Sequence, residues 1–123
     1  MPSSNEDLAV AFSSHRFAEV APHLAEDVRW VAVGGGLYQG RDAVVAACEE
    51  SGSYLATVQT DFRLLRTVVS DSAAVVDSLA DYTEPDGSVL TVSSCDLYDF
   101  RDGKLAEITS YTVELAPKGE RAG

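Results

Sequence analysis

The feature that most constrains the fold is a series of alternating apolar and polar runs in the second half of the chain. These runs cover residues 58–69, 73–83, 89–100 and 105–115. Short polar turns separate them, and two of these turns are Asp-Gly pairs, a strong hairpin signal between alternating runs. The pattern therefore predicts a meander of four antiparallel strands.

Helical patterns occupy the first half. Ser4 can cap a helix in which Leu8 and Phe12 lie one turn apart on a single face. Two further helices are expected over residues 17–25 and 41–51. Helices first and a meander after predict an α+β fold, with three N-terminal helices packed on a curved, mostly antiparallel sheet.

The positions of proline and glycine suggest where the expected helices and loops begin and end. Pro22 must kink or tighten the second helix, and Gly52 is expected to end the third. Between these helices, a strand over residues 28–33 leads into a glycine-rich loop at 34–40. This loop lacks the residues of a phosphate-binding loop and is interpreted as a flexible lip, with Tyr38 as a lid side chain.

The length of the chain and its net charge limit the kinds of molecule that the protein is expected to bind. The 123 residues, 46% apolar and 24% charged, suffice for one domain over residues 1–123 with an ordered core at about 5–115. The net charge of −11 would repel nucleic acids and anionic lipids, so neither a nucleic acid nor a membrane is expected as a partner. No long apolar run or signal peptide is read, which favours a cytoplasmic location.

Neither a metal nor a cofactor is expected. Cys48 and Cys95 are interpreted as free thiols, although a disulfide between them stays possible, and no cysteine or histidine lies at metal-ligand spacing. His15 is expected in an exposed turn, whereas His23 could reach the mouth of a pocket.

Three segments resemble a known superfamily. Residues 24–30 (LAEDVRW), 40–44 (GRDAV) and 98–107 (YDFRDGKLAE) are similar to the nuclear transport factor 2-like superfamily, in its SnoaL-like and ketosteroid isomerase-like branch. The resemblance implies a cone-shaped α+β shell with a deep pocket between helices and sheet. Its members include isomerases, polyketide cyclases, epoxide hydrolases and proteins without known chemistry, so the function must be argued from the site.

The catalytic residues of the family carry over only in part. The protonated aspartate of the ketosteroid isomerases falls on Asp96, but their tyrosine falls on Leu8 and their proton-moving aspartate on Ala32. The acid/base aspartate of SnoaL-type cyclases falls on Ser110. The resemblance therefore implies either another catalytic arrangement or no chemistry.

A pair of carboxylates is the strongest catalytic candidate. A two-residue turn at Asp86-Gly87 would place Asp77 directly opposite Asp96, with Cβ atoms about 5 Å apart. Repulsion and apolar neighbours would then raise the pKa of Asp96, making it an acid and Asp77 a base. Two alternatives stay open: the pair faces solvent, or a three-residue turn keeps the two residues apart.

Other residues are candidates for substrate binding. Arg63 and Arg66 lie three apart and so on opposite strand faces, and one of them would share the face of Asp77, as an epoxide-hydrolase-like Asp-Arg-Asp site or as a plain ion pair. Tyr98 shares the face of Asp96, with a core or rim position as the alternative. The remaining candidates are Trp30, Tyr38, Asp81, Ile108 and Ser110.

Two functions compete on this evidence. One is a small cofactor-independent enzyme, an isomerase, cyclase or hydrolase that acts on an apolar, oxygen-bearing molecule such as a polyketide. The other is a non-catalytic binding or dimerisation module. A homodimer is expected because the sheet face opposite Asp96 would carry few charges. Its alternate residues would be Ala74, Val76, Ser78, Ala80 and Tyr82 on one strand and Thr91, Ser93, Cys95 and Leu97 on the next.

Overall fold

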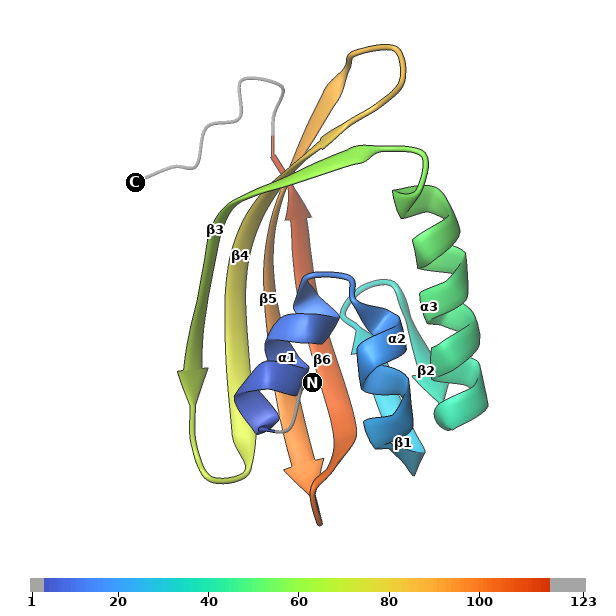
Figure 1. Ribbon diagram of the computed structural model, residues 1–123, viewed down its shortest axis with the longest axis vertical. Coiled ribbons are helices and arrows are strands. Elements are labelled where there is room, and N and C mark those ends of the chain that lie inside the picture. The colour runs from blue at the N-terminus through green and yellow to red at the C-terminus, as the bar shows by residue number, and fades with distance from the viewer. Residues whose placement is uncertain (1–3, 116–123) are drawn as a thin grey trace.

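The computed structural model describes residues 4–115 as four helical segments beside one six-stranded sheet (Figure 1). The helical segments are α1 (Asn5–Ser13), α2 (Phe17–Val20), the 3-10 turn η1 (Ala21–His23) and α3 (Arg41–Leu55). The strands are β1 (Leu24–Ala32), β2 (Gly36–Gln39), β3 (Gln59–Val69), β4 (Ala73–Thr83), β5 (Val89–Arg101) and β6 (Lys104–Glu114).

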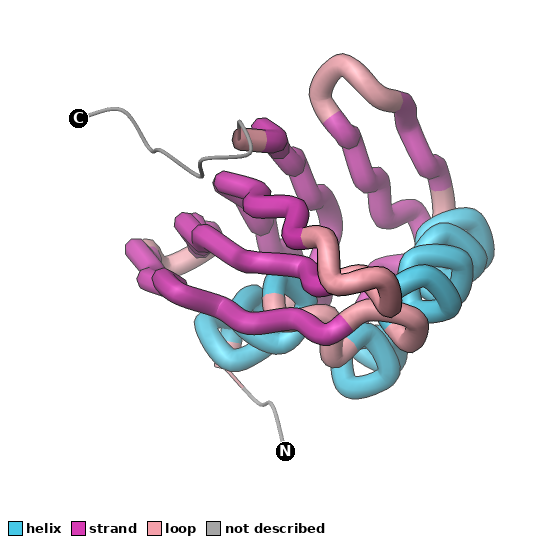
Figure 2. The backbone as a smooth tube through the Cα atoms, turned by 90° about the horizontal axis from the view of Figure 1, so that it is seen from above, coloured by secondary structure: helices cyan, strands magenta, loops and turns pink. Residues whose placement is uncertain are grey.

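The sheet is mostly antiparallel, in the order β2-β1-β6-β5-β4-β3. The exception is the central pair β1–β6, which runs parallel and joins the N-terminal hairpin to the C-terminal meander. Figure 2 shows the strands curving, with the long helix α3 at the open side of the curve. The predicted α+β class and the predicted meander are thus confirmed.

The hairpin signal at Asp102-Gly103 is also confirmed. Arg101 pairs with Lys104 across a two-residue turn, in which Asp102 and Gly103 have φ values of 54° and 76°. Both values lie in the left-handed region, where aspartate is tolerated and glycine adopts the conformation without steric cost.

Apolar side chains from α1, α3, β1 and the last three strands form the core on the helix-covered face. Leu8, Val28, Val44, Leu105 and Ile108 are almost completely buried there. At the N-terminus of α1, the Ser4 hydroxyl accepts a hydrogen bond from the Asp7 amide at 3.0 Å, so the predicted cap is confirmed.

Several predicted boundaries are wrong. The second helix is shorter than expected, because the chain tightens into η1 around Pro22 and already begins β1 at Leu24. Helix α3 continues through Gly52 to Leu55, since the Gly52 carbonyl accepts the Ala56 amide at 2.9 Å as in an ordinary turn. The glycine-rich loop contains strand β2, which pairs with β1.

Candidate functional site

A cavity of about 500 Å³ lies between the inner face of the sheet and the helices. Aromatic side chains dominate its wall, namely Phe12, Phe17, Trp30, Phe62 and Tyr82. Ser13, Asp96 and Ser110 supply polar groups from α1, β5 and β6. A mostly apolar cavity with a few polar groups is the usual form of a small-molecule site.

Strand alternation brings these polar groups together. In the observed register Asp96 lies opposite Ser110 on β6 and opposite Val76 on β4, and Ser94 lies opposite Ser78. Residues directly opposite each other share a sheet face, so Asp96 and Ser110 point to the same side. Helix α1 then places Ser13 above them.

Asp96 is at the centre of a hydrogen-bond network. The Ser13 hydroxyl donates to Asp96 Oδ2 at 2.9 Å, and Ser13 Oγ lies 2.6 Å from the hydroxyl of the buried Tyr98. On the other side, Trp30 Nε1 donates to Ser110 Oγ at 3.0 Å, and the Ser110 hydroxyl also bonds to Asp96.

The direction of each bond in this network follows from the donors available. An indole nitrogen can only donate, so Ser110 accepts from Trp30 and its own proton is free for Asp96. Ser13 donates its single hydroxyl proton to Asp96. In the bond between the Ser13 and Tyr98 hydroxyls, Tyr98 is therefore the donor. Two chains of donors, each relayed by a serine hydroxyl, therefore converge on one carboxylate.

Burial raises the pKa of the Asp96 carboxyl above its usual value, whereas hydrogen bonds from Ser110 and Ser13 oppose the shift. The direction and the contribution of apolar surroundings agree with the sequence-based expectation, whereas repulsion from Asp77, the other expected cause, plays no part. The nearby Asp96 charge also raises the pKa of Tyr82, after burial as the main cause.

His15 is a cavity residue that the sequence analysis placed in an exposed turn. It has φ 69°, in the left-handed region, and its ring lies 5.5 Å from that of Phe62 and 5.8 Å from that of Phe17. Its Nε2 lies 3.4 Å from the Tyr82 hydroxyl. Burial lowers the pKa of His15, which favours the neutral imidazole.

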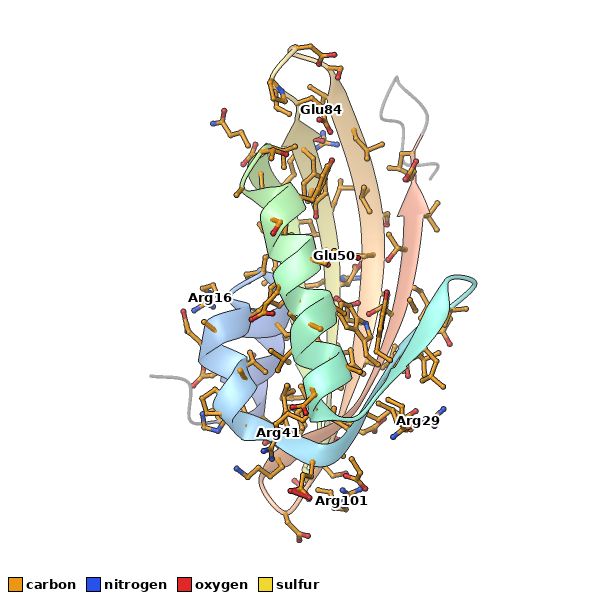
Figure 3. All side chains as sticks on the ribbon, turned by 90° about the vertical axis from the view of Figure 1, so that its right-hand side faces the viewer. Arg16, Arg29, Arg41, Glu50, Glu84 and Arg101 are labelled. Carbon is orange, nitrogen blue, oxygen red and sulfur yellow. The ribbon has the colours of Figure 1, made fainter. Side chains whose placement is uncertain are left out.

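Helix α3 borders the cavity with Glu50 and Tyr54. The Tyr54 hydroxyl donates to Glu84 Oε2 at 2.7 Å, which ties α3 to the loop between β4 and β5. Figure 3 shows Glu50 about half-way along α3 and Glu84 near the C-terminal end of this helix.

A second cavity, of about 340 Å³, lies between α2, η1 and α3. Phe12 and Phe17 line both cavities and so separate them. Cys48 lines the second cavity, and burial raises the pKa of its thiol to about 12. Within residues 4–115, no three His, Cys, Asp or Glu side chains gather in a metal-binding arrangement.

A family profile matches the sequence of this chain. The profile of the SnoaL-like domain matches residues 6–108, most of the chain. This chain belongs to the SnoaL-like domain family. No curated protein matches it in sequence.

Solved structures share the fold of this SnoaL-like domain. An NTF2-like protein of unknown function from Cytophaga hutchinsonii superposes with a TM-score of 0.80 at 22% identity, over 92% of this chain and 99% of that one. A candidate polyketide cyclase from Xanthomonas campestris gives 0.67 at 18% identity, over 85% and 83%. An LEH-like epoxide hydrolase from M. tuberculosis gives 0.64 at 14% identity, over 85% and 75%.

The predicted pairing of Asp77 with Asp96 is wrong. The loop between β4 and β5 contains three residues, Pro85 to Gly87, between the paired residues Glu84 and Ser88. The register therefore moves by one residue, and Asp77 lies opposite Cys95 on the outer face of the sheet. There it accepts a hydrogen bond from Arg66 Nε at 3.0 Å.

Three more candidates from the sequence lie on that outer face in the SnoaL-like domain. Arg63 forms an ion pair of 3.1 Å with Asp81, which also accepts from the Thr91 hydroxyl at 2.7 Å. A register shift between Phe62 and Leu64 brings Arg63 to the same side as Arg66, so the expectation of opposite faces is wrong. Asp77, Asp81, Arg63 and Arg66 are thus away from the cavity.

The other residues predicted to bind substrate lie in the wall of the cavity, in the core or at the exposed rim. Trp30 and Ser110 line the cavity, whereas Ile108 is fully buried opposite Tyr98, two residues from the place expected beside Asp96. Tyr98 is 1% exposed and reaches the site only through its hydroxyl. Tyr38 is 39% exposed on β2, with its ring 5.5 Å from that of Trp30.

Sequence reasoning missed two polar residues of this SnoaL-like domain's site. Ser13 ends α1 one turn after Ala9, on the buried side, and its small polar side chain gave no sign of a distant partner. His15 follows directly in the turn, and only the curvature of β3 and β4 brings Phe62 and Tyr82 over it.

Proposed function

We propose that this protein is a cofactor-independent acid/base enzyme, an isomerase, cyclase or hydrolase, that acts on an apolar, oxygen-bearing small molecule such as a polyketide. The reaction takes place in the 500 Å³ cavity, and Asp96 is the group that exchanges a proton with the substrate. The observation that carries the proposal is the half-buried carboxylate of Asp96, held by hydroxyls and bordered by an aromatic cavity.

A carboxylate in this environment suits proton transfer. Its raised pKa makes ionised Asp96 a stronger base than an exposed aspartate, and protonated Asp96 is still acidic enough to return the proton. In the proposed step Asp96 removes a proton from a carbon next to the substrate's carbonyl group, the C–H electron pair moves towards that oxygen, and the proton returns at another atom.

The surrounding residues have distinct roles in the proposal. Ser13 and Ser110 hold the carboxylate in place and stabilise its charge, and Tyr98 orients Ser13 from beneath. Trp30 contacts the apolar body of the substrate, and Tyr38 covers its outer end. The names of the fold neighbours, a candidate polyketide cyclase and an epoxide hydrolase, are compatible with this class of substrate and reaction.

The alternative is a binding module without chemistry. It is favoured by the position of Asp77 on the outer face, which removes the expected catalytic partner of Asp96 from the cavity. Both functions use the same cavity, so an assay for proton transfer separates them.

Elimination of 5-nitrobenzisoxazole provides this assay. A base removes the ring C–H proton, its electron pair forms the nitrile, and the N–O bond breaks to release a coloured phenolate. Asp96→Asn is expected to lower kcat/KM by at least about a hundredfold, the usual contribution of a general base. Asp77→Asn, the same change on the outer face, is the matched control and should retain the wild-type rate.

Equal rates for wild type and Asp96→Asn would contradict the proposal. A wild type that shows no elimination but copurifies with a small molecule, identified by native mass spectrometry, would instead establish the binding module. Identification of such a molecule would also name the ligand directly.

Two further expectations belong to the proposal. We propose a homodimer, formed through the outer sheet face on which Leu97, Tyr111 and Val113 are exposed.

We also propose a cytoplasmic location, because Cys48 and Cys95 are both free thiols. Separately, residues 4–115 contain no helix of the length and apolar character that crossing a bilayer requires.

A further inference from the structure

The ionised side chains at the wall of the large cavity are all negative. Among the described residues that line it, Asp96 and Glu50 are carboxylates and none is a lysine or an arginine. His15 is the remaining titratable base there, and its burial favours the neutral ring. An anionic ligand would therefore meet repulsion without a compensating cation.

Two arginines that directly follow cavity residues in the sequence are engaged elsewhere. Arg16 forms a 3.0 Å ion pair with Glu19 on α2, and Arg63 pairs with Asp81 on the outer sheet face. Figure 3 shows Arg29, Arg41 and Arg101 grouped at the end of the molecule opposite to Glu84.

The donors around Asp96 are already used. The Trp30 N–H donates to Ser110, and the hydroxyls of Ser13 and Ser110 donate to Asp96. Tyr98 donates to Ser13, as the proton count requires. The floor around Asp96 therefore presents to a ligand a carboxylate with acceptor capacity, whereas the donors beside it are directed at that carboxylate or at one another.

The aromatic wall suits a positive charge. The ring of Phe12 lies 5.1 Å from those of Phe17 and Trp30, and His15 connects this group to Phe62 at 5.5 Å and to Tyr82 at 6.0 Å. The negative faces of such rings attract ammonium groups within about 6 Å of the ring centre. The net charge of −11 adds a field that concentrates cations around the protein.

We propose that the ligand of this cavity carries a positive charge, as a tertiary or quaternary ammonium group on an otherwise apolar frame. The ammonium group contacts the aromatic wall and is paired with the Asp96 carboxylate. The inference rests on the cavity as the ligand site of the proposed function, but it does not depend on proton transfer there.

The test compares two molecules of the same shape that differ in one charge. (4-Hydroxyphenyl)trimethylammonium and 4-tert-butylphenol are titrated into the protein by isothermal calorimetry. An ordinary apolar pocket prefers the neutral molecule, because it loses less hydration on binding. We expect the cation to bind at least about tenfold more tightly, and Asp96→Asn to abolish this preference.

Asp99→Asn is the matched control. It removes the same charge from an exposed position on β5, so the preference for the cation should persist in this variant. Loss of the preference in both variants would attribute it to net charge and overturn the proposed site.

The remaining outcomes also decide the question. Wild-type protein that binds 4-tert-butylphenol as tightly as the cation, or more tightly, overturns the ammonium ligand but leaves the cavity and the proposed enzyme in place. Protein that binds neither molecule overturns both the ammonium ligand and the cavity as its site. An unchanged preference in Asp96→Asn overturns the pairing with this carboxylate.

Discussion

Replacing Ser13 by alanine removes one of the donors that stabilise the Asp96 carboxylate. Ser13 is 6% exposed, so water does not easily take the place of its hydroxyl. A hydrogen bond to a charged group contributes about 1.5–3 kcal/mol and a neutral one about 0.5–1.5 kcal/mol. The difference, about 1 kcal/mol, favours the neutral carboxyl in the variant, so Ser13→Ala raises the pKa of Asp96 further.

The effect on stability must depend on pH. A carboxyl whose pKa is higher in the folded than in the unfolded protein reduces stability as the pH rises from about 4 through the folded pKa. Because Ser13→Ala raises that pKa further, its cost grows with pH. We expect a loss of about 2 kcal/mol at about pH 8 but only about 1 kcal/mol at about pH 4, where more of Asp96 is protonated.

Thermal unfolding of wild type and variant across this pH range measures the cost. A loss of about 1 kcal/mol lowers the Tm by about 4 °C in a domain of this size, so the two ends of the range are distinguishable. Ser93→Ala, which removes a hydroxyl on the outer face of β5, should show no such trend. A Ser13→Ala deficit that stays constant or shrinks as the pH rises would refute the role given to this hydroxyl.

Three other predictions concern the same molecule. Asp96→Asn should be at least as stable as wild type at about pH 8 and lose this advantage below about pH 4, and a clear loss of Tm at about pH 8 would argue against a costly buried charge. Trp30→Phe keeps the aromatic contact with Phe12 but loses the bond to Ser110, so urea denaturation should show a cost of about 1 kcal/mol; no measurable cost would mean that this bond is not formed in solution. Sedimentation should show a dimer that Tyr111→Lys dissociates, and a wild-type monomer at tens of micromolar would eliminate the proposed interface.

Periodicity was sufficient to predict the architecture. The predicted strand over residues 73–83 has the bounds of β4. Strands β3 and β5 differ from their predicted bounds by one residue at one end, and β6 by one residue at each end. Alternation over long strands is a strong signal, because one face must be buried along the full length. The short strand β2 carries too few residues for such a signal.

Which residues face the cavity depends on the length of one loop, and the periodicity of the strands does not reveal that length. One additional residue in the loop after Glu84 moves the register of β4 against β5 by one position, which turns Asp77 from the cavity to the outer face. The same shift exchanges the faces of β4, so Ala74 and Val76 belong to the buried core and not to the proposed dimer face. The position of Asp96 is independent of this loop, because Ser110 and Ser13 contact it from β6 and α1.

Helix ends and turns could be predicted even less well. Gly52 lies within α3, since glycine permits a helix to end but does not force it to. His15 has polar neighbours in sequence, whereas its contacts are aromatic rings of α2, β3 and β4. Such contacts arise from the packing of distant elements, and a local pattern does not record them.

The proposed role of Asp96 requires a carboxyl that titrates above the usual range of aspartate, and this titration can be measured. Carbonyl-carbon NMR of aspartate-labelled protein follows this carboxyl through the pH range, and its resonance is assigned by its absence from Asp96→Asn. We expect a midpoint above the ordinary aspartate value of about 4, because burial in the cavity disfavours the charge. A midpoint at or below about 4 would show that the hydroxyls of Ser13 and Ser110 outweigh burial, and it would contradict Asp96 as the proton-exchanging group of the site.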